Sequence, residues 1–289
     1  MLSKLIKYDF KALSRVLLPT MAAVVGATLI ATFSFLFGTK PYSGASDGGL
    51  LQLLTGLLAV LMVLAIIAAC FLVFFIICAH FYRNLMTDEG YLTFTLPVKT
   101  SEILLSKLIT AMLWTLISGV VICLCVFLFA ALSSAATGDG REFFEQLAQG
   151  LGQIFAALDE KSGLLIFEAI LLGLVSTAFS ILHIYLALVI GGVVSQKHKI
   201  LAGIGFYFVI SIVVSFISAI AQYYFGGALA QNLSGMGLFF DMNDGRQVVN
   251  SLVNAAQPYY WFTLLFTLGL DAGCFFLSKY FLEKKLNLE

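Results

Sequence analysis

Charged residues are scarce in this chain of 289 residues, where Asp, Glu, Lys and Arg make up 11% of the sequence. In soluble domains about 25% of all residues are charged. This chain therefore cannot cover a water-facing surface with polar side chains. The scarcity also excludes a disordered protein and a nucleic-acid-binding protein, because both depend on a high density of charge. The formal net charge is zero, so bulk electrostatics select no partner.

Cysteine is also rare: the chain has five, and each lies within an apolar run. This number is too small for a secreted scaffold held by disulfides. We expect these cysteines to be buried apolar side chains, because unpaired cysteine is common in protein cores. Cys123 and Cys125 are two residues apart, which places them on different faces of a helix and favours neither a disulfide nor a metal site.

Apolar residues, in contrast, make up 61% of the chain, and its mean hydropathy is +1.00. A helix that spans the hydrocarbon core needs about 20 mostly apolar residues, and six runs meet this requirement. They are Val16 to Phe37, Leu50 to Phe81, Leu108 to Leu132, Leu164 to Val194, Ile200 to Phe225 and Tyr259 to Phe281. The pattern predicts an all-α polytopic membrane protein with six transmembrane helices.

The positions of Lys and Arg predict how these spans are oriented, because cytoplasmic loops carry an excess of both residues. When alternate loops are compared, most of the basic residues fall on one side of the membrane. The other side holds only Lys40, Arg141, Lys161 and Arg246. We therefore expect both termini in the cytoplasm and three external loops.

The sequence pattern of residues 1–18 predicts an amphipathic interfacial helix ahead of the first span. Apolar side chains recur there every three or four residues, with basic side chains between them, which is typical of a helix at a membrane surface. The basic side chains are Lys4, Lys7, Lys11 and Arg15. We expect them to meet lipid headgroups or an acidic partner, and we expect Pro19 to mark the turn into the membrane.

Two longer segments are expected outside the membrane, at residues 133–163 and 226–257. The first carries an amphipathic stripe that starts at Phe143, which predicts an external helix on the outer leaflet. The second mixes apolar patches with glycine and acidic residues, and it has room for short re-entrant or surface helices. No internal repeat is evident, so we interpret residues 1–289 as a single transmembrane domain.

Residues 82–107, between the second and third spans, form the one expected cytoplasmic loop that is longer than a short turn. Gly90 breaks the preceding helix, and Pro97 disfavours helix at the residue before it. Thr100 or Ser101 is expected to cap the next helix, and an acidic residue follows in its first turn, where the helix dipole favours negative charge. The loop therefore predicts a helix–break–helix knob in the cytosol. Its charged residues are Asp88, Glu89, Lys99, Glu102 and Lys107.

In this loop the chain resembles the membrane permeases of type-2 ABC exporters. The order of residues in the loop is also similar to that of permeases of Gram-positive bacteria encoded beside an ATP-binding subunit. Those permeases have six spans, internal termini, an interfacial helix before the first span and a coupling helix between the second and third. Their loop signature is an acidic residue and Gly, a Leu/Thr-rich stretch, a Pro, a Ser or Thr cap, and a Lys. Here the signature is Glu89-Gly90, Tyr91 to Leu96, Pro97, Thr100-Ser101 and Lys107.

The resemblance implies a complex of two ABC ATPase subunits and two permeases, either two copies of this chain or one copy and a homologue. ATP and Mg would be bound by the ATPases, with no cofactor on this chain, in a bacterial cell membrane. Closure of the ATPases would be passed to the spans through the loop. The residues assigned to this ATPase-coupling role are Asp88, Glu89, Gly90, Tyr91, Pro97, Lys99, Thr100, Ser101 and Glu102.

Polar side chains inside the spans form a second candidate site, because a charged residue at the centre of a span costs roughly 2.5–3.5 kcal/mol on insertion scales. Helical spacing places Asp271 in the last span on a polar stripe that we expect to face inward, and Glu168 lies on a similar stripe in the fourth. The candidate intramembrane path consists of Glu168, Ser176, Ser180, His183, Thr267, Asp271 and Ser278. Buried contacts that hold helices together also fit these residues.

Gly-x-Ser-x-Gly occurs once, at residues 44–48, but in the first external loop and without the strand and helix that a nucleophile elbow needs. The sequence otherwise lacks enzyme motifs. It has no phosphate-binding Gly-x-x-x-x-Gly-Lys-Ser/Thr motif, so the chain is not itself the ATPase. Its three histidines are widely separated, so we assign no metal ligand and no catalytic residue. Two alternatives stay open: a membrane enzyme that acts on lipid or peptide through Asp271, Glu168 and His183, and a non-transporting sensor or scaffold whose knob recruits a partner.

Overall fold

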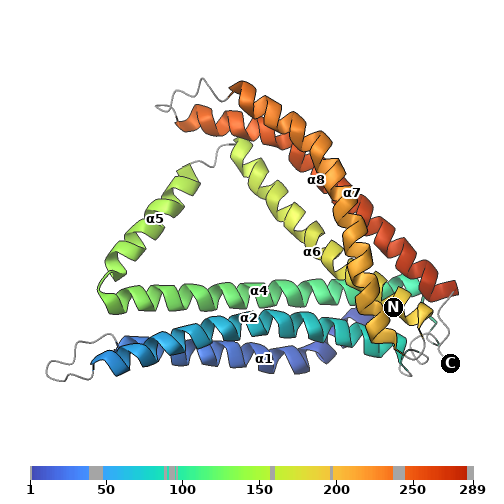
Figure 1. The fold of residues 1–289 in the computed structure, drawn as a ribbon, viewed down its shortest axis with the longest axis horizontal. Coiled ribbons are helices and arrows are strands. Elements are labelled where there is room, and N and C mark those ends of the chain that lie inside the picture. The colour runs from blue at the N-terminus through green and yellow to red at the C-terminus, as the bar shows by residue number, and fades with distance from the viewer. Residues whose placement is uncertain are drawn as a thin grey trace. The chain divides into compact units, whose positions relative to one another are not determined.

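The computed structural model describes residues 2–38, 48–87, 90, 95, 97–156, 160–195, 198–236 and 245–284. Every extended regular element in these ranges is a helix (Figure 1). The helices are α1 (Leu2–Gly38), α2 (Gly48–Met86), α4 (Thr100–Thr137), α5 (Gly140–Ala156), α6 (Glu160–Val194), α7 (Lys199–Met236) and α8 (Gly245–Lys284). Their contacts form two compact units, Met1–His80 with Ile109–Gln153, and Phe81–Leu108 with Ile154–Glu289.

Within the described residues, six helices are long and apolar enough to cross a membrane, which confirms the predicted all-α fold with six spans. The candidate spans are Leu2–Leu36, Gly56–Met86, Thr100–Ala135, Ile166–Val194, Lys199–Tyr224 and Gln257–Lys284. In hydrocarbon every backbone N–H and C=O needs a partner within the protein, and a helix supplies these partners within each segment.

The first unit is built on α1, α2 and α4, which lie side by side (Figure 1). Val24, Ala69 and Cys125, one from each helix, form a buried cluster, and Ile66 and Val121 pack against it. Small side chains at such a contact let helix backbones approach closely, which is the usual way that helices associate in lipid.

Helix α1 continues through Pro19 without interruption, so the turn that we expected at Pro19 does not end the helix. Proline removes one intrahelical hydrogen bond, and tertiary packing can compensate for this loss. Around Pro19, Leu17 is 0% and Met21 is 5% exposed. Residues 2–18 are therefore helical, as predicted, and they continue directly into the first span.

The two segments expected outside the membrane are largely helical. In residues 133–163, α5 follows α4, and the rings of Phe143 and Phe127 pack with their centroids 6.3 Å apart. Phe144 and Leu151 are exposed on α5. In residues 226–257, α7 continues to Met236 and α8 begins at Gly245, so the described part of this segment holds the ends of two long helices.

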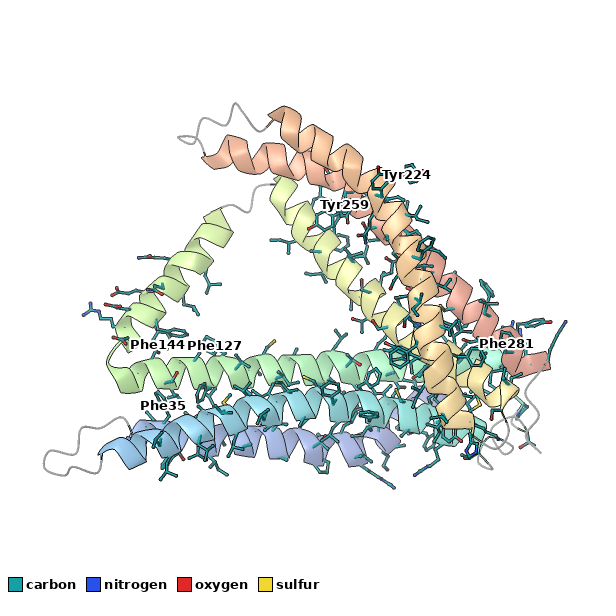
Figure 2. The ribbon with its side chains drawn as sticks, viewed as in Figure 1. Phe35, Phe127, Phe144, Tyr224, Tyr259 and Phe281 are labelled. Carbon is teal, nitrogen blue, oxygen red and sulfur yellow. The ribbon has the colours of Figure 1, made fainter. Side chains whose placement is uncertain are left out.

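Figure 2 labels Tyr224 on α7 and Tyr259 on α8, which lie at the ends of the candidate spans Lys199–Tyr224 and Gln257–Lys284. Tyr223 and Tyr224 are 78% and 71% exposed, and Trp261 is 47% exposed. Tyrosine and tryptophan are enriched where a span meets the membrane–water interface. These rings therefore mark the ends of the last two spans close to the boundaries predicted from the sequence.

The five cysteines are free, but they are less uniformly buried than we expected. Cys125 and Cys274 are buried, whereas Cys70 and Cys123 are exposed on their helices. An exposed apolar side chain on a span is compatible with lipid, so an apolar run does not predict burial within the chain. Cys123 and Cys125 do lie on different faces, as their spacing predicted.

Helices α6 and α7 approach each other closely at Gly191. A Cβ atom at this position would overlap the backbone of Gly203 and lie 2.9 Å from the carbonyl carbon of Ala202. Backbone atoms cannot rotate away as a flexible side chain can, so this contact requires a residue without a side chain. Close contacts of this kind are frequent where helices pack in membranes.

Replacing Gly191 with alanine is expected to destabilise the chain by roughly 1–3 kcal/mol, the usual cost of overfilling a packed site. Gly205→Ala is the matched control, because nothing lies within 4 Å of an added Cβ there and alanine favours the helix. Thermal unfolding of the purified chain in detergent measures both variants. Unchanged stability of Gly191→Ala would contradict the close approach of α6 and α7.

Candidate functional site

The cytoplasmic loop predicted as the coupling segment begins at the buried end of α2. Phe81 and Leu85 are both 0% exposed, and Met86 is 1% exposed. After the helix ends, the Thr87 hydroxyl donates to the carbonyl of Arg83, and the N–H of Gly90 donates to the carbonyl of Thr87 (2.7 Å). The hydrogen bond between Gly90 and Thr87 therefore closes a tight turn directly after α2.

Gly90 is buried in this turn. A Cβ atom there would lie 2.6 Å from the carbonyl oxygen and 2.9 Å from the carbonyl carbon of Leu85. Both are backbone atoms of the last turn of α2, so they cannot move aside without unwinding the helix. The glycine of the Glu-Gly pair is thus required by the path of the chain. Asp88, Glu89 and Tyr91 lie outside the described residues.

The next helix, α4, begins with Lys99 as its N-cap. The N–H groups of Glu102 and Ile103 both donate to the Lys99 carbonyl, at 2.8 and 3.3 Å. We expected Thr100 or Ser101 to be the N-cap. The N-cap is, however, defined as the residue whose carbonyl accepts the first hydrogen bond of the helix, and its side chain does not enter that definition. Pro97 lies in the bend just before the helix. Glu102 lies in the first turn, as predicted.

The loop and its flanking helix ends belong to the second compact unit, together with α6, α7 and α8. The ring of Phe81 stacks on Tyr185 of α6, with centroids 3.7 Å apart and planes 10° from parallel. The Tyr185 hydroxyl donates to the backbone carbonyl of Lys107 (3.4 Å). Tyr185, which is 2% exposed, therefore contacts the end of α2 and the start of α4 at once.

A second contact joins the loop to α7. The Lys199 ammonium group donates to the carbonyl of Met86 (3.3 Å), one of the last carbonyls of α2, which have no partner within their own helix. A cation is favourable there because it opposes the negative end of the helix dipole. Leu108 completes the attachment by packing against a buried cluster that contains Leu182 and Cys274.

Sequence reasoning missed Phe81, Tyr185 and Lys199 as parts of this site. The hydrogen bonds of Tyr185 and Lys199 join residues 78 and 113 positions apart, and helical periodicity carries no information at such separations. A tyrosine close to the predicted cytoplasmic end of the fourth span was the one visible signal. In the first compact unit, Nε2 of His80 lies 3.6 Å from Oδ1 of Asp9.

The candidate intramembrane residues of α6 separate into two kinds. Glu168 is 3% and His183 is 7% exposed, whereas Ser176 and Ser180 are exposed, with the Ser180 hydroxyl donating to the Ser176 carbonyl (3.0 Å). His183 Nε2 lies 3.4 Å from the hydroxyl of Ser211 on α7. The predicted polar stripe is thus not one continuous buried surface.

On α8 the stripe that was expected to face inward is largely covered. Ser278 is 0% and Cys274 is 6% exposed, and Asp271 is half-buried. Thr267 donates to the carbonyl of Thr263 in its own helix (2.7 Å). Among the described residues, no partner is present for Asp271 Oδ1, for Ser278 Oγ or for either carboxyl oxygen of Glu168.

These helices define a multi-pass membrane protein whose loop between the second and third spans is attached to the later helices. Residues 51–146, about a third of the chain, match the model of a family described as ABC-2 family transporter protein. The matched residues include the coupling segment and the candidate spans on either side of it. No curated protein and no solved structure matched the chain. The chain therefore resembles type-2 ABC permeases, and the match supports a transporter permease.

Tyr185→Leu is expected to destabilise the chain by roughly 2–4 kcal/mol, since it removes a buried ring stack and leaves a cavity. Tyr185→Phe keeps the stack and should cost about 1 kcal/mol or less, the usual worth of one neutral hydrogen bond. Thermal unfolding in detergent gives the order of the variants. Tyr223→Leu, at a residue 78% exposed, serves as the control. Equal stability of Tyr185→Leu and the control would argue against the stack.

Proposed function

We propose that this protein is the permease subunit of an ABC exporter that works with two separate ATPase subunits and a second permease, either another copy or a homologue. The observation that carries the proposal is the contact of Phe81, Met86 and Lys107, at the helix ends that flank the loop, with α6 and α7. A loop that merely linked two spans would need no such contacts. In a permease, they would transmit a displacement of the loop to the helices beyond it.

The geometry suits a segment that transmits a displacement, because the contacts around the loop leave little room for movement. The turn at Gly90 leaves no space for a side chain, and α4 begins only a few residues later, at Thr100. Force applied to the loop would reach α6 through the face-to-face rings of Phe81 and Tyr185. It would reach α7 through Lys199. Closure of the ATPases would in this way shift two spans together and alternate the side from which the substrate site opens.

The remaining parts of the proposal come from the resemblance to type-2 ABC permeases. ATP and Mg are bound by the ATPase subunits, and this chain carries no cofactor. The complex lies in a bacterial cell membrane, with both termini of the permease in the cytoplasm. Transport runs outward, and the candidate cargoes are peptides, antimicrobial compounds and lipid-linked molecules.

Asp271 and Glu168 are the best candidates for intramembrane residues that act in transport. Each has at least one carboxyl oxygen with no partner among the described residues, and an unpaired polar group in an apolar environment is costly unless another group meets it. A substrate or an ion pathway would supply such a group. Ser176 and Ser180 support the path less well, because both are exposed.

A membrane enzyme that uses Asp271, Glu168 and His183 together is less compatible with the fold. Glu168 and His183 are 15 residues apart in the unbroken helix α6, which separates them by roughly 22 Å at 1.5 Å per residue. Catalytic groups must come within hydrogen-bond reach of one substrate. Enzymatic activity on lipid or peptide, reconstituted without any nucleotide-binding subunit, would favour the enzyme. A sensor or scaffold would instead bind its partner without any transport.

Replacing Glu89 and Gly90 with alanine tests the docking role of the loop. We expect at least a tenfold loss of ATPase co-purification and of coupled ATP turnover, because the change removes a charge from the docking surface and forces a side chain against Leu85. Glu142→Ala, which removes a charge from the exposed face of α5, is the control. If assembly and coupled turnover both survive the change at Glu89 and Gly90, the docking role is wrong.

Asp271→Asn tests the role of the last span. The substitution keeps the size of the side chain and removes its charge, so we expect transport per ATP to fall at least severalfold while the ATPases remain bound. Transport into vesicles and co-purification are measured on the same preparation. Loss of assembly would instead identify Asp271 as a structural residue.

A further inference from the structure

The four basic residues that precede the first span lie on one side of α1. At about 100° per residue, Lys4, Lys7, Lys11 and Arg15 fall within an arc of roughly 80°. All four side chains are exposed. They therefore form a continuous basic face along three turns of the helix.

No exposed acidic residue interrupts this basic face. Asp9 is the only acidic residue in positions 2–18, and it is 8% exposed. Its carboxylate lies on the opposite side of the helix, where Oδ1 is 3.6 Å from Nε2 of His80 on α2. Within residues 2–18, every charged side chain on the exposed side of the helix is thus positive.

The apolar face of the same helix is already occupied by protein. Leu13 is 2% and Leu17 is 0% exposed, and Phe10 stacks on Trp114 of α4 with ring centroids 4.9 Å apart. A surface helix ordinarily inserts its apolar face into lipid. Here its most buried residues pack within the first compact unit, and the four cations lie on the side that stays exposed, together with the apolar Val16 and Leu18 (50% and 58% exposed).

Apolar side chains that are exposed on α2 and α4 indicate where the hydrocarbon core ends relative to the basic face of α1. Phe75 on α2 is 61% exposed and precedes His80 by five residues, and Leu113 on α4 is 41% exposed beside Trp114. These side chains reach within about 8 Å of the residues that contact Asp9 and Phe10, at 1.5 Å per residue. Because apolar surface is favoured in hydrocarbon and disfavoured in water, we place the lipid boundary near Phe10.

The basic residues are then placed at headgroup level. Lys7 and Lys11 lie within about 5 Å of Phe10 along the helix axis, and Lys4 and Arg15 within about 9 Å. The headgroup layer on each side of a bilayer is roughly 5–8 Å thick, and the long stems of Lys and Arg extend their reach by several ångströms. All four cations can therefore contact phosphate groups of the same leaflet.

We propose that the basic face of α1, formed by Lys4, Lys7, Lys11 and Arg15, binds the headgroups of anionic phospholipids in the leaflet that the N-terminus faces. Juxtamembrane basic clusters are attracted to anionic lipid, with each residue contributing about a fivefold increase in affinity. Bound lipid anchors α1 at the membrane surface while its apolar face holds α2 and α4. This role is independent of any transport function.

The test uses the full chain reconstituted in mixed phosphatidylglycerol and phosphatidylcholine, followed by detergent extraction and mass spectrometry of the retained lipid. Lys7→Gln/Lys11→Gln is expected to lower the retained ratio of phosphatidylglycerol to phosphatidylcholine at least fivefold. Lys7→Arg/Lys11→Arg should preserve the ratio. Lys279→Gln/Lys284→Gln, which removes two cations from the end of α8, is the matched control and should leave it nearly unchanged.

Three results would overturn the proposal. The retained ratio could be the same in wild type and Lys7→Gln/Lys11→Gln, which would mean that the lysines are merely solvated. The control variant could lower it equally, which would indicate a general effect of net charge. Finally, in a parallel co-purification with the ATPase subunits, the lysine variant could lose an ATPase subunit while its lipid ratio stays constant, which would assign the basic face to a protein partner. Thermal unfolding checks that each variant is folded.

Discussion

Hydrocarbon offers no hydrogen bonds, and this constraint determines how the chain is organised. Each backbone N–H and C=O must find its partner inside the protein, so the spans are long, unbroken helices. Side-chain hydroxyls follow the same rule: Thr28 donates to Val24 (2.9 Å) and Thr32 to Thr28 (2.7 Å) within α1. Once these groups are satisfied locally, helices associate through small side chains, as at Gly191 and in the cluster around Ala69.

The same constraint explains which features were predictable from the sequence. Spans were predictable because about 20 consecutive apolar residues have few alternatives to a transmembrane helix, and α6 ends at Val194 as expected. The effect of Pro19 was harder to predict, since a proline can end a helix or be accommodated by its neighbours. The cap at Lys99 was also missed, because the sequence favours hydroxyl side chains at a position that is defined by a backbone carbonyl.

The contacts of Tyr185 lay beyond sequence reasoning for a different reason. Periodicity relates residues within one helix, whereas Tyr185 joins the ends of two other helices. Nothing in one sequence specifies which face of the fourth span meets Phe81. The candidate coupling residues were found because they follow one another along the chain, and their attachment to α6 and α7 became visible only in three dimensions.

Hydroxyl and carboxyl groups in the spans differ in how they can be satisfied. A threonine hydroxyl donates to a carbonyl of its own helix, as Thr267 does, and a serine hydroxyl can rotate to do the same. An ionised carboxylate only accepts hydrogen bonds, and the N–H groups of a helix interior are already used. Glu168 and Asp271 therefore need partners from outside their own helices. This chemical difference, more than their shared helical spacing with serine and threonine, separates them as the stronger candidates for a role in transport.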